Sequence, residues 1–237
     1  MNKKEWIDET LGRMVLRVDR RARNFIFRTK VDGIYITMPP YATQTDLENA
    51  LEELRPKLEK NRKEVPQKSA VGLGYSIEVP DFKMEIVEGT GSGVVSRFND
   101  GCMRVECPAG TDFNDVHLQK WLEKQLERGL KYSASLHLFP RLYRLSAKTG
   151  LTYTSLKITV SKGRWGSCSQ TGSINLSCYL MTLPDHLIDY VLLHELCHTV
   201  EMNHGPQFWD LLNKYTGGRA QALRQELHSH STAELWR

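Results

Sequence analysis

The most constraining feature of the chain is a pair of histidines four residues apart, within the segment DYVLLHELCHTVEMNH at residues 189–204. The pattern H-E-x-x-H at residues 194–198 is typical of a helix that holds a metal ion. Side chains four apart lie on one face of a helix, about 6 Å apart along its axis, so both imidazoles can converge on one ion. His194 and His198 are therefore predicted to be metal ligands.

Glu195 follows the first of these histidines directly, rotated by about 100° around a helix of 3.6 residues per turn. This offset places its carboxylate beside the ion without making it a ligand. A zinc ion held by three protein ligands keeps its fourth position open for water. Glu195 is therefore predicted to be the general base that takes a proton from that water.

The predicted third ligand is His204, six residues after His198. Gly205 and Pro206 are helix-ending and helix-starting residues, so the chain can turn back toward the ion there. The spacing equals that of the third histidine in H-E-x-x-H-x-x-G-x-x-H, although the glycine of that pattern is Glu201 here. Three alternatives stay open: a chance motif on a surface helix, His204 as a loop or capping residue, and Glu201 as a competing ligand.

Length and composition indicate a globular protein. The 237 residues are enough for one domain, or one domain with an appended piece, and 40% of them are hydrophobic. A net charge of +4 is compatible with weak nucleic-acid contact but does not indicate it. The N-terminus is charged and has no apolar run after it, which predicts no signal peptide. No run of 18 apolar residues occurs, which predicts no membrane span.

The five cysteines point to a reducing compartment. Their number is odd and no two are spaced C-x-x-C, so neither a disulfide framework nor a zinc ribbon is indicated. This usage favours a cytoplasmic location. Cys197, inside the H-E-x-x-H segment, is predicted to be a small buried hydrophobic residue. The chain also has no G-x-G-x-x-G and no phosphate-loop motif, so nucleotide chemistry is not indicated.

Hydrophobic periodicity predicts strands in two blocks, each followed by a helix. The first block comprises strands 14–18, 24–29 and 34–38 and a helix over 47–58. The second comprises strands 75–79, 83–87, 94–98 and 103–107 and a helix over 115–150 that is broken at Pro140. A strand at 156–160, the metal helix and two short helices follow. This order predicts an α+β fold, with antiparallel or mixed sheets packed against helices and a zincin-like metal helix near the C-terminus.

The two blocks are similar to each other. Asp32-Gly33 and Asp100-Gly101 each precede a strand, a proline and a helix, which indicates a repeat of a hairpin and a helix. Two unrelated hairpins with the same turn residues are the alternative. We predict a strand-rich N-terminal region at 1–110 and a second region at 111–237 that carries the metal site, with one continuous domain as the alternative.

Three separate blocks of sequence carry a resemblance to a known family. They are Arg164-Trp-Gly-Ser-Cys168-Ser, Tyr190-Val-x-x-His194-Glu-Leu-Cys-His198 and Asn203-His204-Gly-Pro-x-Phe208-Trp209. In this order they resemble the YgjP-like metal-dependent hydrolases, which are relatives of the SprT-like proteases. The likeness is strongest over 156–215 and extends more weakly over most of the chain.

The resemblance implies a zincin-type site, with a sheet beside the H-E-x-x-H helix and His204 as the third ligand. It also implies a metallopeptidase that acts on proteins or peptides. SprT-like relatives cut DNA-bound proteins, but this chain lacks their cysteine-rich zinc ribbon, so that role is not carried over. The usual asparagine of the family in the strand after the Trp-Gly-Ser-Cys block corresponds to Ser177, to which we assign no role.

The resulting hypothesis is a Zn²⁺-dependent metallopeptidase in which Glu195 moves the proton. The expected ligands are His194, His198 and His204. Nickel, iron and cobalt also suit imidazole ligands. Three residues are candidates to stabilise the negative charge that develops on the substrate carbonyl. They are Tyr190, Arg164 and Ser167.

Two other classes of protein compete with this hypothesis. The first is a binding or adaptor protein whose zinc serves only folding, so that metal loss unfolds the chain and no substrate is cleaved. The second is a nucleic-acid-associated protein, for which steep salt dependence of binding is expected. The sequence predicts neither the substrate, the cleavage preference nor the oligomeric state.

Overall fold

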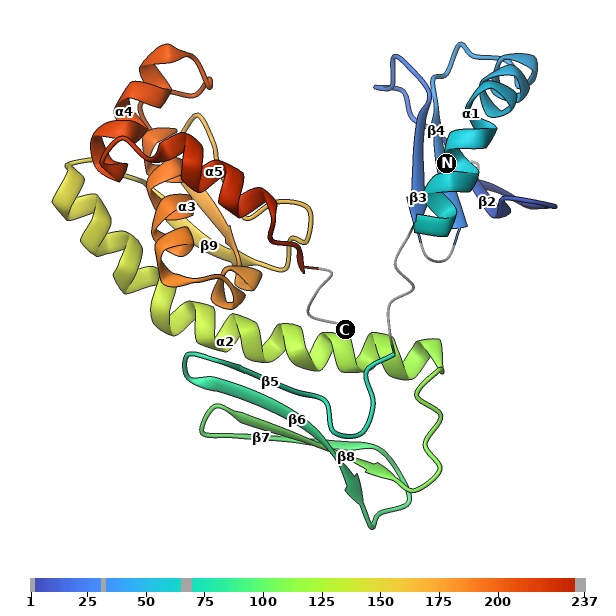
Figure 1. Cartoon of the computed structure of the whole chain (residues 1–237), viewed down its shortest axis with the longest axis horizontal. Helices are drawn as coiled ribbons and strands as arrows, with labels where there is room; N and C mark the ends of the chain where they lie inside the picture. Colours follow the sequence, from blue (N-terminus) through green and yellow to red (C-terminus); the bar gives the residue numbers. More distant parts are fainter. Residues whose placement is uncertain (1–2, 31–32, 65–69, 233–237) are drawn as a thin grey trace. The chain divides into compact units, whose positions relative to one another are not determined.

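The computed structural model describes residues 3–30, 33–64 and 70–232. The chain divides into two compact units, Met1–Ser69 (unit 1) and Ala70–Arg237 (unit 2). The described residues form five α-helices, one 3₁₀ helix and three sheets, each with both parallel and antiparallel pairs (Figure 1). The predicted α+β class with mixed sheets is confirmed.

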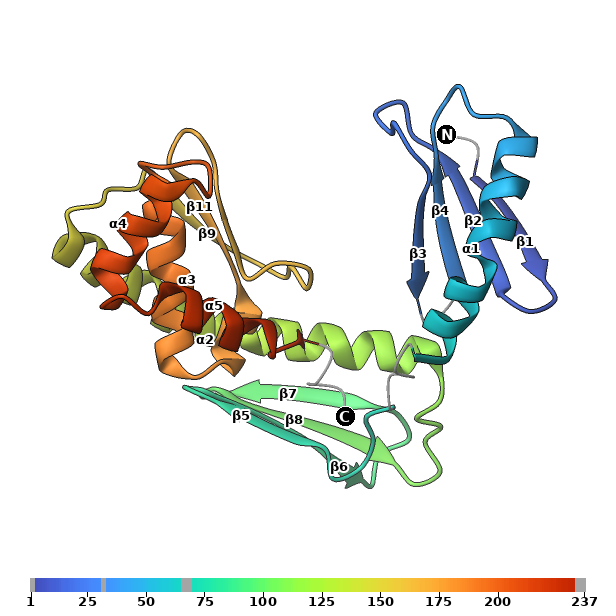
Figure 2. The same cartoon turned by 45° about the horizontal axis from the view of Figure 1, so that its top comes forward.

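Unit 1 is a four-stranded sheet with one helix on one of its faces (Figure 2). Its elements are β1 (Lys3–Asp8), β2 (Gly12–Val18), β3 (Ile26–Lys30), β4 (Gly33–Met38) and α1 (Gln44–Glu64). The strand order is β1-β2-β4-β3, and β2 is parallel to β4. A hydrophobic core lies between sheet and helix and consists of Leu11, Met14, Ile34, Ile36, Leu47 and Leu58.

The β1–β2 turn is attached to the helix by one carboxylate. Asp8 accepts hydrogen bonds from the backbone N–H groups of Thr10 and Leu11, at 3.0 and 2.9 Å. The Arg55 guanidinium of α1 donates to both Asp8 oxygens at 3.0 Å. The hydrogen bond from Arg55 holds the pKa of Asp8 well below its usual range. The sequence did not predict β1, and the turn predicted at Asp32 lies outside the described residues.

The first part of unit 2 has the same topology as unit 1. Its elements are β5 (Ser76–Val79), β6 (Phe82–Gly89), β7 (Val95–Asn99), β8 (Cys102–Pro108) and α2 (Val116–Thr149). The strand order is β5-β6-β8-β7, and β6 is parallel to β8. Gly33 and Gly101 hold the same place in the two sheets. A Cβ on either would lie 2.4 Å from a backbone oxygen, that of Arg13 or Asp81, so neither position admits a side chain.

Helix α2 is continuous, so the predicted break at Pro140 is wrong. The ring removes one N–H from the helix and leaves the carbonyl of Leu136 without its helical donor. Both residues are exposed, so water can satisfy that carbonyl. Buried leucines on either side, Leu138 and Leu142, hold the two parts in the core. In Figure 1 the helix changes direction where its colour passes from green to yellow.

Gly129 of α2 lies directly against the ring of Phe82 from β6. A Cβ on this glycine would lie 1.9 Å from two ring carbons. We therefore expect Gly129→Ala to lower the free energy of unfolding by about 1–3 kcal/mol through overpacking, although alanine is the better helix former. Urea unfolding measures the change. Lys124→Ala, at an exposed position of the same helix, serves as the control and should shift stability by less than about 0.5 kcal/mol. Unchanged stability of Gly129→Ala would contradict this packing.

The remaining elements form the part of unit 2 that contains the H-E-x-x-H helix. They are β9 (Ser155–Thr159), β10 (Gly166–Cys168), β11 (Ser173–Ser177), the 3₁₀ helix η1 (Cys178–Thr182), α3 (Asp185–Cys197), α4 (Pro206–Thr216) and α5 (Ala220–His228). The strand order is β10-β11-β9. Helix α3 is buried around most of its circumference, as expected for a core helix.

An arginine of α2 fixes the start of α3. The Arg141 guanidinium contacts Asp185 Oδ1 and Asp189 Oδ1, both at 2.6 Å, and donates to the backbone carbonyl of Asp185. The hydrogen bond from Arg141 lowers the pKa of Asp185. These contacts hold the helix that carries both histidines of the motif in a fixed position on α2.

Residues 70–110 belong to the second unit because their apolar side chains share its core. Phe82, Met84 and Val105 lie in one buried cluster with leucines of α2 and α3. The boundary between the compact units thus falls near residue 69, whereas the regions expected from the sequence were 1–110 and 111–237. None of the described helices is long and apolar enough to cross a membrane.

Candidate metal centre

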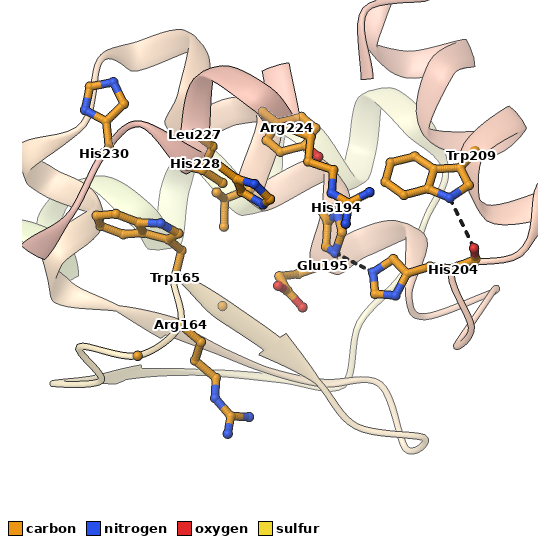
Figure 3. Close-up of a pocket in the computed structure, with 14 residues that line it drawn as sticks. Arg164, Trp165, His194, Glu195, His204, Trp209, Arg224, Leu227, His228 and His230 are labelled. Carbon is orange, nitrogen blue, oxygen red and sulfur yellow. Dashed lines mark hydrogen bonds between the residues drawn. The ribbon is translucent and has the colours of Figure 1, made fainter. Parts of the chain in front are cut away.

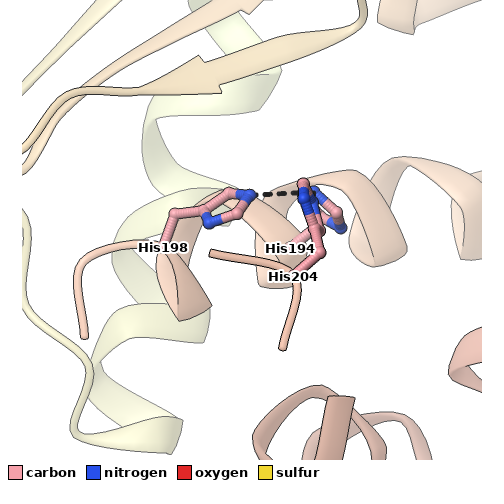
Figure 4. Close-up of side chains that lie close together, drawn as sticks. All are labelled: His194, His198 and His204. Carbon is pink, nitrogen blue, oxygen red and sulfur yellow. Dashed lines mark hydrogen bonds between the residues drawn. The ribbon is translucent and has the colours of Figure 1, made fainter. Parts of the chain in front are cut away.

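Three imidazole nitrogens converge at the end of α3 (Figure 4). His194 Nε2 lies 3.1 Å from His198 Nε2 and 3.1 Å from His204 Nε2. The three possible ligand atoms all lie within 4.8 Å of one another. Tetrahedral zinc with nitrogen at its usual bond length separates its ligand atoms by about 3.3 Å. The cluster therefore fits one metal ion.

A backbone carbonyl sets the tautomer of His198. Its Nδ1 lies 3.0 Å from the carbonyl oxygen of Glu201, which can only accept a hydrogen bond. Nδ1 therefore carries the proton, and the lone pair of Nε2 faces the other two histidines. Among the described residues, the group able to hold an ion comprises three histidines and not the Glu201 carboxylate.

The loop after α3 returns His204 to the cluster. Helix α3 ends at Cys197 with His198 as its C-cap, Gly205 is the N-cap of α4, and Pro206 occupies the first turn of α4. The Trp209 indole N–H donates to the His204 carbonyl at 3.1 Å, which holds the loop against α4. A helix begins at Pro206 as predicted, but α3 ends at Cys197, before the helix end expected at Gly205-Pro206.

Phe208 forms the floor beneath the cluster. Its ring centroid lies 4.9, 4.5 and 4.8 Å from the rings of His194, His198 and His204. The side chain is fully buried. Sequence reasoning assigned Phe208 no role, although it stands in the third block of the family pattern.

Burial keeps two of the imidazoles neutral. Desolvation, together with the neighbouring His198 and His204, lowers the pKa of His194 to about 3. Desolvation also lowers the pKa of His198. A neutral imidazole is the form that binds a metal, so neither ring would have to lose a proton before binding one at neutral pH.

Glu195 is buried beside the cluster with one oxygen unpaired. Its side chain belongs to a residue that is 5% exposed, and Oε2 has no hydrogen-bond partner among the described residues. Burial raises the pKa of Glu195 to about 8, and the positive charge of Arg164 opposes this effect. A cation nearby favours the ionised carboxylate. A buried, unpaired carboxyl oxygen implies a polar partner such as water or substrate.

Gly166 of strand β10 packs directly against the side chain of Glu195. A Cβ on Gly166 would lie 2.6 Å from Glu195 Oε1 and 2.7 Å from its Cγ. Ser167, next along the strand, points to the other face. It lines a separate hollow of about 310 Å³.

A cavity of about 540 Å³ opens in front of Glu195 and the cluster (Figure 3). Its walls include Trp165, Trp209 and Arg224. The Arg224 guanidinium lies over the Trp209 ring, 5.2 Å from its centroid. Sequence reasoning missed Arg224 as a lining residue because no local pattern connects α5 with the motif.

Two of the residues expected to assist catalysis, Tyr190 and Arg164, line the cavity. Tyr190 is buried and lines the cavity, with its ring centroid 6.0 Å from that of His194. Desolvation raises its pKa, which favours the protonated phenol. Arg164 also lines the cavity, but Figure 3 shows its side chain directed away from the histidines.

Ser177, to which the sequence assigned no role, has a structural one. Its hydroxyl donates to the Ser161 carbonyl at 2.6 Å, and the residue caps η1.

A histidine cluster able to hold a metal, at the edge of an open cavity, is the arrangement of metal-dependent hydrolases. The model of the YgjP-like metallopeptidase domain family matches residues 23–230, and the chain belongs to this family. Membership implies a divalent metal and protein or peptide substrates. A search of curated proteins found no match.

Two solved structures are similar to part of the chain. One is the metallopeptidase zymogen of Pyrococcus abyssi abylysin, with 23% identity, 38% of this chain and 90% of that chain covered, and a TM-score of 0.35. The other is the metallopeptidase zymogen of Methanocaldococcus jannaschii jannalysin, with 21% identity, 38% and 92% covered, and a TM-score of 0.34.

Proposed function

We propose that the protein is a zinc-dependent metallopeptidase that cleaves peptide bonds with Glu195 as general base. One observation carries the proposal: three imidazole nitrogens meet beside a buried carboxyl oxygen that has no partner among the described residues. Histidines 194, 198 and 204 would hold the ion. When bound, the ion would act as a Lewis acid toward the peptide carbonyl and make water easier to deprotonate.

Glu195 would move one proton in each of two steps. Its unpaired Oε2 would first accept a proton from the attacking water. The same carboxyl group would then deliver that proton to the nitrogen of the leaving amine. Tyr190 is our candidate donor to the developing oxyanion, because its buried ring lines the cavity next to His194.

A free strand edge next to Glu195 is evidence that the site binds a peptide in extended conformation. In the described sheet β10 and β9 are the two edge strands, and β10 is the one that covers Glu195. A peptide that pairs with β10 would pass its scissile bond along the cavity.

The number of protein ligands favours a catalytic metal site over a structural one. A structural zinc site is closed by four protein ligands, whereas the group in the described part of the chain has three. Zinc is our proposal for the native metal, with other divalent transition metals as alternatives. All five cysteines are free, which supports a reducing, cytoplasmic compartment.

Metal removal tests the proposal. We expect a chelator to abolish peptide cleavage by the purified protein and added Zn²⁺ to restore it. His204→Ala should lower metal occupancy and cleavage at least about tenfold, because it removes one of three ligands. His117→Ala, at an exposed histidine outside the cluster, is the control and should change neither. Elemental analysis and a peptide library give the two measurements.

Two outcomes would contradict the proposal. In the first, the metal-loaded protein cleaves no member of the library, and chelation unfolds it. That result would indicate an adaptor whose metal serves folding. In the second, His204→Ala binds metal and cleaves peptides like the unaltered protein, which would exclude His204 as a ligand.

A further inference from the structure

The net charge of the protein resides in unit 1. Residues 1–69 contain 15 Lys and Arg against 11 Asp and Glu, while residues 70–237 contain 17 of each. The formal charge of +4 therefore belongs to the unit that lacks the metal cluster. An excess of positive charge in one unit indicates an anionic partner for that unit.

Unpaired arginines concentrate in the β2–β3 loop and in β3. Four side chains there are exposed and make no ion pair or hydrogen bond with the described residues. We call these four the arginine cluster: Arg20, Arg21, Arg23 and Arg28. The loop itself is ordered, because the Asp19 carbonyl accepts the Ala22 N–H at 3.0 Å and the Met38 carbonyl accepts the Asp19 N–H at 3.1 Å.

Two acidic groups of the same sheet and its loop already have partners. Asp19 accepts the Arg21 backbone N–H at 3.0 Å and lies 3.7 Å from the Arg17 guanidinium. On the sheet face turned away from α1, Glu5 pairs with Arg13 at 2.9 Å. The cluster is thus left without a carboxylate to neutralise it within the described part of unit 1.

The sheet of unit 2 with the same topology gives an internal comparison. Its exposed face also carries arginines, but these are neutralised: Arg104 pairs with Glu85 at 3.0 Å, and Arg97 pairs with Glu106 at 2.7 Å. The β6–β7 loop, which corresponds to the arginine-bearing loop, is Thr-Gly-Ser-Gly-Val at 90–94 and carries no charge. The free arginines are therefore not required by this fold.

An exposed aromatic ring stands next to the cluster. Tyr41 is 71% exposed, and its hydroxyl donates to the Arg23 carbonyl. Ile26, between the loop and Arg28, is 41% exposed. Arginines provide forked donors for phosphate oxygens, and a free tyrosine ring provides a surface on which an unpaired base can stack.

We infer that the arginine cluster and Tyr41 form a binding site for single-stranded nucleic acid. The combination of unpaired guanidinium groups with an accessible ring matches a chain of phosphates and open bases better than a purely acidic peptide, which offers nothing to stack. The site belongs to unit 1 alone and does not depend on the peptidase proposal.

Fluorescence anisotropy with the full chain tests this inference. The probes are labelled 20-nucleotide single strands of RNA and DNA, the matching duplex, and a poly-glutamate peptide. We expect the single strands to bind most tightly, with an affinity that falls steeply as salt rises from 50 to 200 mM. The variant Arg20→Ser/Arg21→Ser/Arg23→Ser should weaken binding at least about tenfold. It should also lower the slope of log K against log salt concentration by the equivalent of about two phosphate contacts.

A second variant that loses the same number of positive charges distinguishes binding at the arginine cluster from non-specific electrostatic attraction. Lys120→Ser/Lys124→Ser/Arg144→Ser removes three exposed cations of α2 that make no ion pair in the described structure, and it should change affinity less than twofold. Tyr41→Leu should weaken binding to a mixed-base strand about fivefold or more and leave an abasic strand unaffected.

Three results would overturn the inference. They are single-strand binding that is undetectable at 50 mM salt, equal losses in the two triple variants, and tighter binding of poly-glutamate than of any nucleic acid. The last result would assign the cluster to an acidic protein partner. The Arg20→Ser/Arg21→Ser/Arg23→Ser variant should unfold in urea at the same concentration as the unaltered chain, which shows that any loss of binding is not a loss of folding.

Discussion

Replacing Glu195 with glutamine is expected to lower peptide cleavage by about 10²–10⁴-fold, the usual contribution of a general acid–base group. The amide has the shape of the carboxyl group, so the buried pocket under β10 should accept it without repacking. It cannot take a proton from water or return one to the leaving amine. The metal content should stay unchanged, because Glu195 is outside the group of three histidines.

The measurements are kcat/KM on a peptide that the unaltered protein cleaves, and metal per chain by elemental analysis. Glu201→Gln makes the same chemical change at a residue that contributes a backbone carbonyl to the site, and it should retain most activity. Full activity in Glu195→Gln would eliminate the proposed mechanism. Loss of metal in that variant would instead indicate that the carboxylate is a ligand.

Gly166→Ala is expected to lower activity by about 10²-fold, which is the effect of displacing a catalytic group by close to 1 Å. The new Cβ would lie 2.6–2.8 Å from Oε1, Cγ and Cδ of Glu195, whereas ordinary contacts begin at 3.4 Å. Glu195 or the strand must therefore move. The three atoms nearest the new Cβ all belong to Glu195 and none to a histidine, so the metal should remain.

Gly163→Ala is the matched control, since a Cβ at Gly163 meets no atom within 4 Å. It should leave cleavage and metal content as they are. A urea unfolding curve for each variant separates displacement of Glu195 from loss of folding. If Gly166→Ala cleaves peptides at the rate of the unaltered protein, then Glu195 is not the group that this strand positions for catalysis.

Strand and helix patterns were predictable where one periodicity dominates. The alternation over 83–87 and 103–107 corresponds to β6 and β8, whose alternate residues are buried against α2. Strand β1 was missed because its mixed charges show no clear apolar face until β2 pairs with it. Pro140 was misjudged because the missing hydrogen bond faces solvent, while leucines on both sides hold the helix in the core.

The sequence by itself determined that His194 and His198 share a helical face, and that a new helix begins at Pro206. Both are local consequences of helical period and of helix-starting residues. Only the tertiary structure decided that Gly166 covers Glu195, that Phe208 lies under the imidazoles and that Arg224 lines the cavity. These contacts join elements far apart along the chain, and their geometry depends on how whole helices and sheets pack, which no local pattern encodes.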